Sequence, residues 1–511
     1  MCCNCNMNRR EFLKTASSSV AGISLGLTSP LFLSNEFEEW NADKPLIHTG
    51  KTLVVQPVLL YEIYEKKPQT SWRPWGGLHN ESDITGEVNR IAKELDSLND
   101  KIDFPIKILP VAKVQSVEEA IKVRDTTNYD VMIIYAASGG GNTFEALTSQ
   151  SKYNLIFLRQ TSGPIYLWYE IVHCRFLRKG GKNFELDTYR NPAGIDINDV
   201  VIDNYQDLLW RLRAMYGLKN FIGSRIVALG GAGGWGCPQA PQLAKDKYGI
   251  EIINVEYKEL EERINYYKKS NNLIPKIDEF TRKYISTPNT ELITDKKFVV
   301  NAFLLYSIFR ELMKEYDSQA FTIKECMSTV MPISETTACL PLSLINDDGL
   351  LAFCESDFNV IPSGILLHYI SGKPVFLNDP TYPYNGIVTV AHCTAPRRMD
   401  GKNYSPTKLL THFESDYGVA PKVDLKKGEI LTMICPDCSQ KEWVGFKGTI
   451  VGSPFYDICR SQYDIEINGD WEKLLKDMRG FHWMMALGDY TKEMGYALRK
   501  IGLSWIDVSK I

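Results

Sequence analysis

Three apolar, β-rich stretches between residues 350 and 396 each end in a side chain that can bind a metal ion or transfer a proton. These side chains are Glu355, Asp379 and His392. A carboxylate at the end of a strand lies at the rim of a sheet, where α/β proteins bind ligands. Carboxylates and imidazoles gathered in this way suit Mn²⁺ or a similar divalent cation. The simpler alternative is that one acid caps a helix and the others are solvated, but three such side chains in one short segment favour a shared metal site.

The segment between the two acids has the pattern of a helix. Glu355 and Asp379 lie 24 positions apart (379 − 355), and residues 361–370 between them are apolar and end before Gly372, a suitable stop signal. We therefore expect a β-α-β unit with one acid at the end of each strand. Both acids are candidate catalytic residues, because a carboxylate can bind a metal ion or transfer a proton. His368, on the apolar face of the helix, is expected to be structural.

A fourth candidate ligand, His482, lies near the end of the chain among aromatic and Met residues. Such neighbours are more typical of a packed core histidine than of a ligand. However, Gly480 lets the backbone approach closely, and the residues near position 355 provide the other ligands. We expect His482 to bind the metal from the start of a closing helix over residues 481–501.

Hydrophobic patterning predicts the elements that position these side chains. Two successive regions alternate strands with helices, which is typical of doubly wound parallel sheets. After residue 396, short β-like runs separated by turn residues predict a small antiparallel barrel or sandwich. The strands are expected at 51–62, 106–110, 129–135, 224–229 and 250–255, and the helices at 84–98, 116–125, 199–215, 257–269 and 295–316.

These patterns define the expected fold class as two doubly wound α/β domains followed by a C-terminal β-rich, barrel-like domain. The chain has 511 residues, too many for one core. We place the boundaries at 1–43 for a signal and linker, 44–190 for the first α/β domain, 191–349 for the second, and 350–511 for the catalytic β-rich domain with its closing helix.

Composition indicates a globular protein without a polyanionic partner. Apolar residues make up 44% of the chain, charged residues make up 23%, and the formal net charge is −4. Lys and Arg are spread along the chain and form no basic tail, so nothing points to nucleic acid or to an anionic membrane surface.

The N-terminus has the pattern of a twin-arginine export signal. Arg9 and Arg10 precede a weakly apolar stretch, residues 15–34, that contains no acid. The alternative is a disordered basic start followed by a chance apolar run. We expect the twin-arginine translocation machinery to export the protein to the periplasm. That route carries folded proteins, often already loaded with a cofactor, which fits a metal site filled before export.

Cysteine usage does not indicate a disulfide scaffold. Three of the twelve Cys precede the twin arginines, and the other nine are scattered over the chain. Cys435 and Cys438 form a C-x-x-C pair without a second pair at zinc spacing. We interpret this pair as a turn that carries two thiols, and the sequence leaves open whether they form a disulfide.

A glycine-rich loop offers a competing interpretation. Gly231, Gly233 and Gly236 fit the G-x-G-x-x-G pattern, and Glu256 follows 20 residues later (256 − 236). Pro241 argues against nicotinamide binding, because it lies too deep in the helix that should follow the loop. A tight strand-to-helix turn, or a loop that contacts a sugar or a neighbouring subunit, stays open.

Three segments resemble the C-terminal half of the L-fucose isomerase and L-arabinose isomerase superfamily: 352–357 (AFCESD), 366–379 (LLHYISGKPVFLND) and 391–396 (AHCTAP). The order of domains is similar as well. Members of this superfamily bind Mn²⁺ through a Glu, a second acid and a late His, which implies Glu355, Asp379 and His482 here. The arabinose branch adds a His shortly after the second acid, which implies His392.

The resemblance implies a metal-dependent aldose–ketose isomerase that converts a monosaccharide through an enediol and forms a homo-oligomer. Trp72 and Trp75 are candidates to stack on the sugar, from a neighbouring subunit as in the family; the alternative is that they are core aromatics. Two other functions stay open. One is a non-catalytic sugar-binding protein of the same fold, and the other is a nicotinamide-dependent sugar oxidoreductase.

Overall fold

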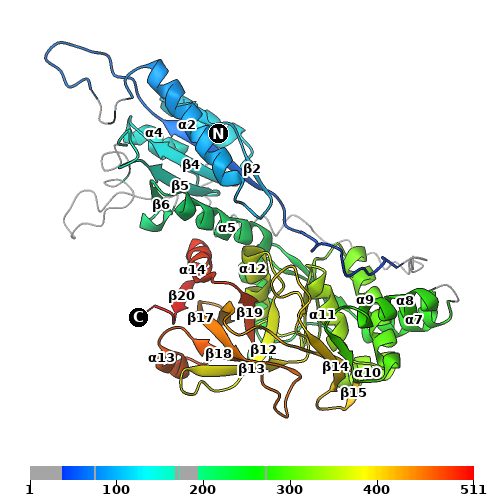
Figure 1. Cartoon of the computed structure of the whole chain (residues 1–511). Coiled ribbons are helices and arrows are strands. Elements are labelled where there is room, and N and C mark those ends of the chain that lie inside the picture. The colour runs from blue at the N-terminus through cyan, green and yellow to red at the C-terminus, as the bar shows by residue number, and fades with distance from the viewer. Residues whose placement is uncertain are drawn as a thin grey trace. The chain divides into compact units, whose positions relative to one another are not determined.

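The computed structural model describes residues 37–73, 76, 78–166, 172, 194–270 and 273–510. The twin-arginine segment and Trp75 therefore lie outside the described residues. The chain divides into two compact units (Figure 1). Unit 1 covers Gly50–Lys219, and unit 2 covers Asn220–Ile511 together with a segment that ends at Thr49.

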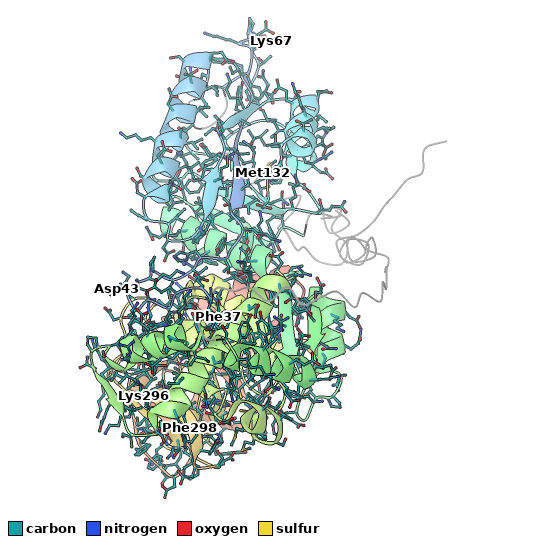
Figure 2. The ribbon with its side chains drawn as sticks, turned by 90° about the vertical axis from the view of Figure 1, so that its right-hand side faces the viewer. Phe37, Asp43, Lys67, Met132, Lys296 and Phe298 are labelled. Carbon is teal, nitrogen blue, oxygen red and sulfur yellow. A yellow bond between two sulfur atoms is a disulfide. The ribbon has the colours of Figure 1, made fainter. Side chains whose placement is uncertain are left out.

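Unit 1 is built on a parallel sheet with the strand order β2-β1-β4-β5-β6, and β3 pairs with β1 beyond the end of β2. The central strands are apolar on both faces because they are buried on both faces; Met132 in β4 is an example (Figure 2). Helix α2 begins at an Asn80 cap whose side chain accepts the backbone N–H groups of Ser82 and Asp83. The strands are β1 (Leu53–Leu60), β2 (Ile106–Ile108), β3 (Ala112–Val114), β4 (Val131–Ala136), β5 (Tyr153–Leu158) and β6 (Val200–Ile202). The helices are α2 (Glu81–Asn99), α3 (Val117–Thr126), α4 (Gly141–Leu147), the 3₁₀ turn η3 (Ile197–Asp199) and α5 (Tyr205–Phe221), which leads into unit 2.

Unit 2 begins with a second parallel sheet, in the order β11-β10-β7-β8. Its main core lies between this sheet and the helices, and Phe37 and Phe298 are members of that core (Figure 2). The strands are β7 (Arg225–Leu229), β8 (Glu251–Val255), β10 (Ala320–Ile323) and β11 (Leu351–Phe353). The helices are α6 (Ala240–Tyr248), α7 (Tyr257–Lys268), α8 (Leu273–Ile285), α9 (Lys296–Glu315), the π turn η4 (Cys326–Val330), α10 (Met331–Ser334), α11 (Cys339–Asp347) and α12 (Ile361–Ser371).

The C-terminal part of unit 2 is a closed barrel of six antiparallel strands. The order is β16-β19-β12-β13-β18-β17, and β17 pairs back with β16 to close the barrel. Strand β20 pairs in parallel with β17 at the edge of the barrel sheet. A separate sheet of three strands consists of β9, β14 and β15. The bounds are β9 (Thr290–Leu292), β12 (Phe376–Pro380), β13 (Ile387–His392), β14 (Thr407–His412), β15 (Tyr417–Val423), β16 (Ile430–Pro436), β17 (Glu442–Gly452), β18 (Ser461–Ile467), α13 (Trp471–Lys476), β19 (Trp483–Leu487), α14 (Thr491–Lys500) and β20 (Ser504–Asp507).

The mixed α/β class, the parallel sheets and the C-terminal barrel confirm the coarse prediction. Three finer predictions are wrong. The segment expected to begin a helix at residue 199 contains strand β6, and α5 begins only at Tyr205. The strands before the two acids do not form a β-α-β unit, because β11 pairs with β10 in the parallel sheet and β12 pairs with β13 and β19 in the barrel. The expected closing helix over 481–501 is instead the buried strand β19 followed by the shorter helix α14.

The predicted boundaries at residues 190 and 349 stay predictions. Strand β6 lies after the first boundary but pairs with β5, which lies before it. In the same way, β11 lies after the second boundary and pairs with β10, which lies before it. Among the described residues, no helix is both long enough and apolar enough to cross a membrane.

Candidate metal centre

Glu355 is positioned by a tight turn directly after β11. Glu355 and Ser356 both have positive φ angles, 63° and 45°. Non-glycine residues in this region cost about 1–3 kcal/mol each, so the surrounding contacts must hold them there. The Gly233 N–H donates to the Ser356 carbonyl (3.1 Å), and the Phe358 N–H donates to the Gly233 carbonyl (3.0 Å). The glycine-rich loop after β7 therefore supports the turn that presents Glu355.

Asp379 and His392 come from adjacent barrel strands. Asp379 in β12 pairs with Ala391 in β13, which places it beside the end of β13, where His392 lies. The His392 ring is 4% exposed, and its Nδ1 lies 3.1 Å from the Thr394 hydroxyl. If Nδ1–H donates to this oxygen, Nε2 presents its lone pair to the site.

His482 lies immediately before β19 and is fully buried. Its Nδ1 donates to Asp357 Oδ2 at 2.8 Å, while Asp357 Oδ1 accepts the Asn359 N–H at 3.0 Å. This carboxylate–histidine pair fixes the tautomer in which Nε2 can bind a cation. Asp357 was not predicted as a site residue, although its position two residues after Glu355 was a usable signal.

The structure brings the four predicted ligands together. His482 Nε2 lies 3.3 Å from Glu355 Oε2 and 3.3 Å from Asp379 Oδ1, and His392 Nε2 lies 3.7 Å from Glu355 Oε1. Ligand atoms of Asp379, His392 and His482 all lie within 4.8 Å of one another. Oxygen and nitrogen ligands at ~2.0–2.6 Å from a cation are at most ~5 Å apart, so these spacings suit one divalent cation.

The hydrogen bonding of two buried atoms in the cluster indicates whether its residues fit a metal ion. Asp379 Oδ1 and His482 Nε2 lie within ion-pair distance of each other, but neither makes a hydrogen bond of regular geometry with any described residue. Buried polar atoms are normally satisfied, and an unsatisfied pair needs an explanation. A cation between them, with Glu355 and His392 completing the set, would satisfy both atoms. The donor set of carboxylate oxygens and imidazole nitrogens fits Mn²⁺ or a similar cation, without specifying which.

The charges of the cluster shift the pKa values of its members in opposite directions. Burial alone would raise the pKa of Glu355, but interactions with the His392 and His482 rings hold it well below its usual range. Burial would lower the pKa of His482, but its contacts with Asp357, Glu355 and Asp379 raise it to about 10. The pKa of Asp379 is raised, because the effect of burial exceeds the opposing effect of the His392 and His482 rings. Without a cation the cluster thus holds itself together as an ion-pair network.

The cluster opens into a cavity of about 810 Å³. Glu355, Asp379 and His392 line it together with two aromatic side chains, Trp235 and Phe481. These two rings stack with their centroids 4.6 Å apart and their planes 8° from parallel, and about half of each residue is exposed. The rings form an exposed apolar wall next to His482, whose ring Trp235 meets edge-on at 5.8 Å.

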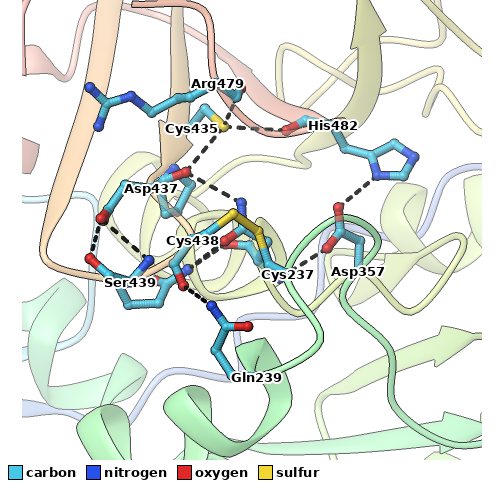
Figure 3. The surroundings of a disulfide bond; sticks show 12 residues. Cys237, Gln239, Asp357, Cys435, Asp437, Cys438, Ser439, Arg479 and His482 are labelled. Carbon is cyan, nitrogen blue, oxygen red and sulfur yellow. Dashed lines mark hydrogen bonds and ion pairs between the residues drawn. A yellow bond between two sulfur atoms is a disulfide. The ribbon is translucent and has the colours of Figure 1, made fainter.

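A disulfide between Cys237 and Cys438 ties the glycine-rich loop to the turn between β16 and β17 (Figure 3). Figure 3 also shows the Asp357–His482 contact beside this disulfide. Cys435 is a buried free thiol that contacts the Arg479 carbonyl. Cys435 and Cys438 therefore do not form a disulfide with each other, and the interpretation of a turn that carries two thiols is wrong for Cys438, which is disulfide-bonded to Cys237. The partner of Cys438 lies 201 residues away, a pairing that local spacing cannot reveal.

No protein-family model and no curated protein matches this chain. The resemblance to the isomerase superfamily therefore rests on the quoted segments, and the site is interpreted from its geometry.

Trp72, one of the two Trp residues predicted to bind substrate, is not among the residues that line the cavity. Trp72 belongs to unit 1, where Lys66 and Arg73 approach its ring. Trp75 lies outside the described residues. A role for either residue at a neighbouring subunit's site stays a prediction. Sequence reasoning missed Trp235 and Phe481, although Trp235 lies within the glycine-rich loop and Phe481 directly precedes His482.

Asp357→Asn should weaken Mn²⁺ binding by about 10–100-fold while preserving the fold, because a neutral amide holds and polarises the His482 ring less well. Titration calorimetry on metal-free protein measures the change. Asp464→Asn is a suitable control, since Asp464 is a barrel carboxylate that accepts from the Thr389 hydroxyl and belongs to neither group of possible metal ligands. Equal Mn²⁺ affinities for Asp357→Asn and the unmodified protein would refute the positioning role of Asp357.

Proposed function

We propose that the protein is a metal-dependent aldose–ketose isomerase. The observation that carries the proposal is the convergence of Glu355, Asp379, His392 and His482 beside a cavity large enough for a monosaccharide. The resemblance of the three segments to the L-fucose and L-arabinose isomerases supports the same function.

The chain's own groups suit the chemistry. Isomerisation moves a proton between C1 and C2 of the sugar through an enediol. Glu355 and Asp379 both line the cavity, and a carboxylate oxygen of each lies 3.3 Å from His482 Nε2. One carboxylate can therefore take the proton and the other can return it. A divalent cation held by the four ligands, Mn²⁺ in this proposal, would stabilise the negative charge that develops on the two sugar oxygens.

The exposed wall of Trp235 and Phe481 suits the apolar face of a pyranose or an open-chain sugar. Aromatic rings bind such C–H faces through their apolar surface, without the need to satisfy hydroxyl groups. The wall also shields the reacting carbons from water, which strengthens the electrostatic interactions within the site.

Trp235→Ala should raise KM for the sugar roughly tenfold and change kcat little, because the ring contributes binding rather than proton transfer. A loss of ~1.4 kcal/mol of sugar binding corresponds to this factor. Steady-state kinetics with the best aldose of a panel measures both constants. Trp471→Ala is the matched control, since Trp471 packs against the barrel core and does not line the cavity. A fall in kcat at unchanged KM would contradict the assigned role of Trp235.

The decisive experiment incubates Mn²⁺-loaded protein with a panel of aldoses in D₂O and detects the ketose and its deuterium by NMR. Proton transfer through the carboxylates predicts ketose that carries solvent deuterium at C1. Ketose without deuterium would contradict carboxylate-mediated transfer. Sugar binding without any ketose would instead favour the non-catalytic sugar-binding alternative.

The geometry disfavours nicotinamide binding at the glycine-rich loop. Pro241 lies in the first turn of α6, which begins at Ala240, so the argument that it lies too deep in the helix is wrong. The better argument is that the loop is already engaged. Gly233 is hydrogen-bonded in both directions to the Glu355 turn, and Cys237 is tied to Cys438. In this proposal the loop supports the metal site.

The proposed place of action is the periplasm, reached through the twin-arginine machinery. Replacing Arg9 and Arg10 with Lys should leave the protein in the cytoplasm, because the receptor recognises the arginine pair. Fractionation of cells that express either form measures the effect. An unchanged periplasmic yield of the double variant would refute the export prediction.

A further inference from the structure

A second set of possible metal ligands overlaps the first. The Cys354 sulfur, a Glu355 oxygen and a His392 nitrogen all lie within 4.8 Å of one another. Cys354 directly precedes Glu355, is partly buried, carries no disulfide and lines the same cavity. This set contains a soft sulfur ligand that the four ligands of the proposed Mn²⁺ site lack.

The Glu355 carboxylate faces both sets at once. Its Oε2 lies 3.3 Å from His482, on the side of Asp379, whereas its Oε1 lies 3.7 Å from His392. His392 has its Nδ1 engaged with Thr394, so a single nitrogen, Nε2, remains for a cation. One nitrogen lone pair binds one cation, and the two sets therefore cannot both use His392 at the same time.

We propose that Cys354, Glu355 and His392 form an alternative binding position for a thiophilic divalent cation, with Zn²⁺ as the natural occupant. Zn²⁺ favours sulfur, imidazole and carboxylate ligands in tetrahedral sites, and three protein ligands leave a fourth position for water. The thiol proton leaves to solvent as the sulfur–metal bond forms. Mn²⁺ favours the oxygen and nitrogen ligands on the other side of Glu355.

Four other free thiols line the cavity, and a comparison with them explains why Cys354 is the proposed sulfur ligand. None of them belongs to a ligand set within the described part of the chain: Cys326, Cys339, Cys393 and Cys459. Occupation of the Cys354 position would withdraw the His392 nitrogen from the Mn²⁺ set. Zn²⁺ should therefore compete with Mn²⁺ for binding, whether or not the protein acts on sugars.

The test uses Co²⁺ as a spectroscopic substitute for Zn²⁺, with the metal-free full chain. A Co²⁺–thiolate bond gives an intense ultraviolet charge-transfer band, which oxygen and nitrogen ligands do not give. We expect this band in the unmodified protein, its loss on addition of Zn²⁺, and its absence in Cys354→Ser. Cys339→Ser is the matched control and should keep the band. Cys354→Ser should also retain its affinity for Mn²⁺.

Absence of the band in the unmodified protein, or its persistence in Cys354→Ser, would overturn the proposal. A second measurement needs no variant, in case Cys354→Ser does not fold. Zn²⁺ should protect Cys354 from alkylation by iodoacetamide, as read by mass spectrometry, whereas Mn²⁺ should not. Equal labelling of Cys354 with and without Zn²⁺ would also overturn the proposal. Neither measurement depends on isomerase turnover, so its outcome is independent of the proposed function.

Discussion

Glu355→Gln should lower kcat for isomerisation by ~10²–10⁴-fold, the range associated with the loss of a positioned acid or base. The amide keeps the shape of the side chain but removes the negative charge that faces both His392 and His482. Bound Mn²⁺ should fall as well, because an amide oxygen is a weaker ligand than a carboxylate. Turnover of the best aldose and metal analysis of the purified variant measure the two effects.

A matched control for this variant is Glu414→Gln. Glu414 lines the same cavity, but it is exposed and belongs to neither ligand set. Its replacement should leave kcat and Mn²⁺ content unchanged. Full turnover and full metal content in Glu355→Gln would remove the basis of the proposed site.

Glu355→Gln should also destabilise the metal-free protein near neutral pH. The two rings hold the pKa of Glu355 below its unfolded value, against the effect of burial. A carboxylate with a depressed pKa contributes stability above its unfolded pKa of about 4.3, and that contribution is lost as pH falls through the folded pKa. The difference in melting temperature between the two proteins should therefore be largest near neutral pH and shrink in acid. A metal-free Glu355→Gln that melts higher than the unmodified protein at neutral pH would contradict this expectation.

The affinity for Mn²⁺ should rise at least about tenfold per pH unit across the neutral range, because the cation must displace a proton from His482. Contacts with Glu355 and Asp379 raise the pKa of His392 as well, against the effect of burial, so this ring can add to the proton release. Burial alone would lower the pKa of the His482 ring, but Asp357, Glu355 and Asp379 raise it to about 10. The metal-free ring is therefore protonated at neutral pH. Calorimetry from about pH 6 to about pH 9, in buffers that differ in ionisation enthalpy, measures both the affinity and the proton released. An affinity that does not change with pH would contradict the raised pKa.

The raised pKa of His482 also predicts how the stability of the folded protein changes with pH. A histidine whose folded pKa exceeds its unfolded value stabilises the native state fully below the unfolded pKa of about 6.5. That stabilisation, on the order of 3–5 kcal/mol for this shift, should decline as pH rises from 6.5 towards 10. Asp357→Asn should reduce both this decline and the proton release, because Asp357 is the hydrogen-bond partner that favours the charged ring.

The four candidate ligands that the structure brings together could be recognised in the sequence, whereas the elements that carry them could only partly be predicted. Glu355, Asp379 and His392 were recognisable as polar ends of apolar runs. The sequence did not reveal that β11 and β12 belong to different sheets, because strand partners depend on contacts that are remote in sequence. The residues of β19 were assigned to a helix for the same reason, since a short apolar run fits either element until the barrel provides its neighbours.

The supporting residues were harder to predict than the ligands. The position of Asp357, two residues after Glu355, was a usable signal, but its role became evident only from its contact with His482. The glycine-rich loop matches a nucleotide-binding pattern locally, yet its role depends on the Glu355 turn, more than 100 residues away. Trp235 and Phe481 form a wall only because the folded chain places them face to face.

The placement of the ligands on two sheets affects how unit 2 melts. Glu355 follows the parallel sheet, whereas Asp379 and His392 belong to barrel strands and His482 directly precedes one, so a bound cation would cross-link two layers that could otherwise separate. The Cys237–Cys438 bond joins the same two layers across 201 residues, and closure of so long a loop removes on the order of 5 kcal/mol of chain entropy from the unfolded state. The covalent and ionic links act in parallel, so the oxidised, metal-loaded unit 2 should unfold in a single cooperative step, and removal of both links should allow the barrel and the parallel sheet to unfold separately.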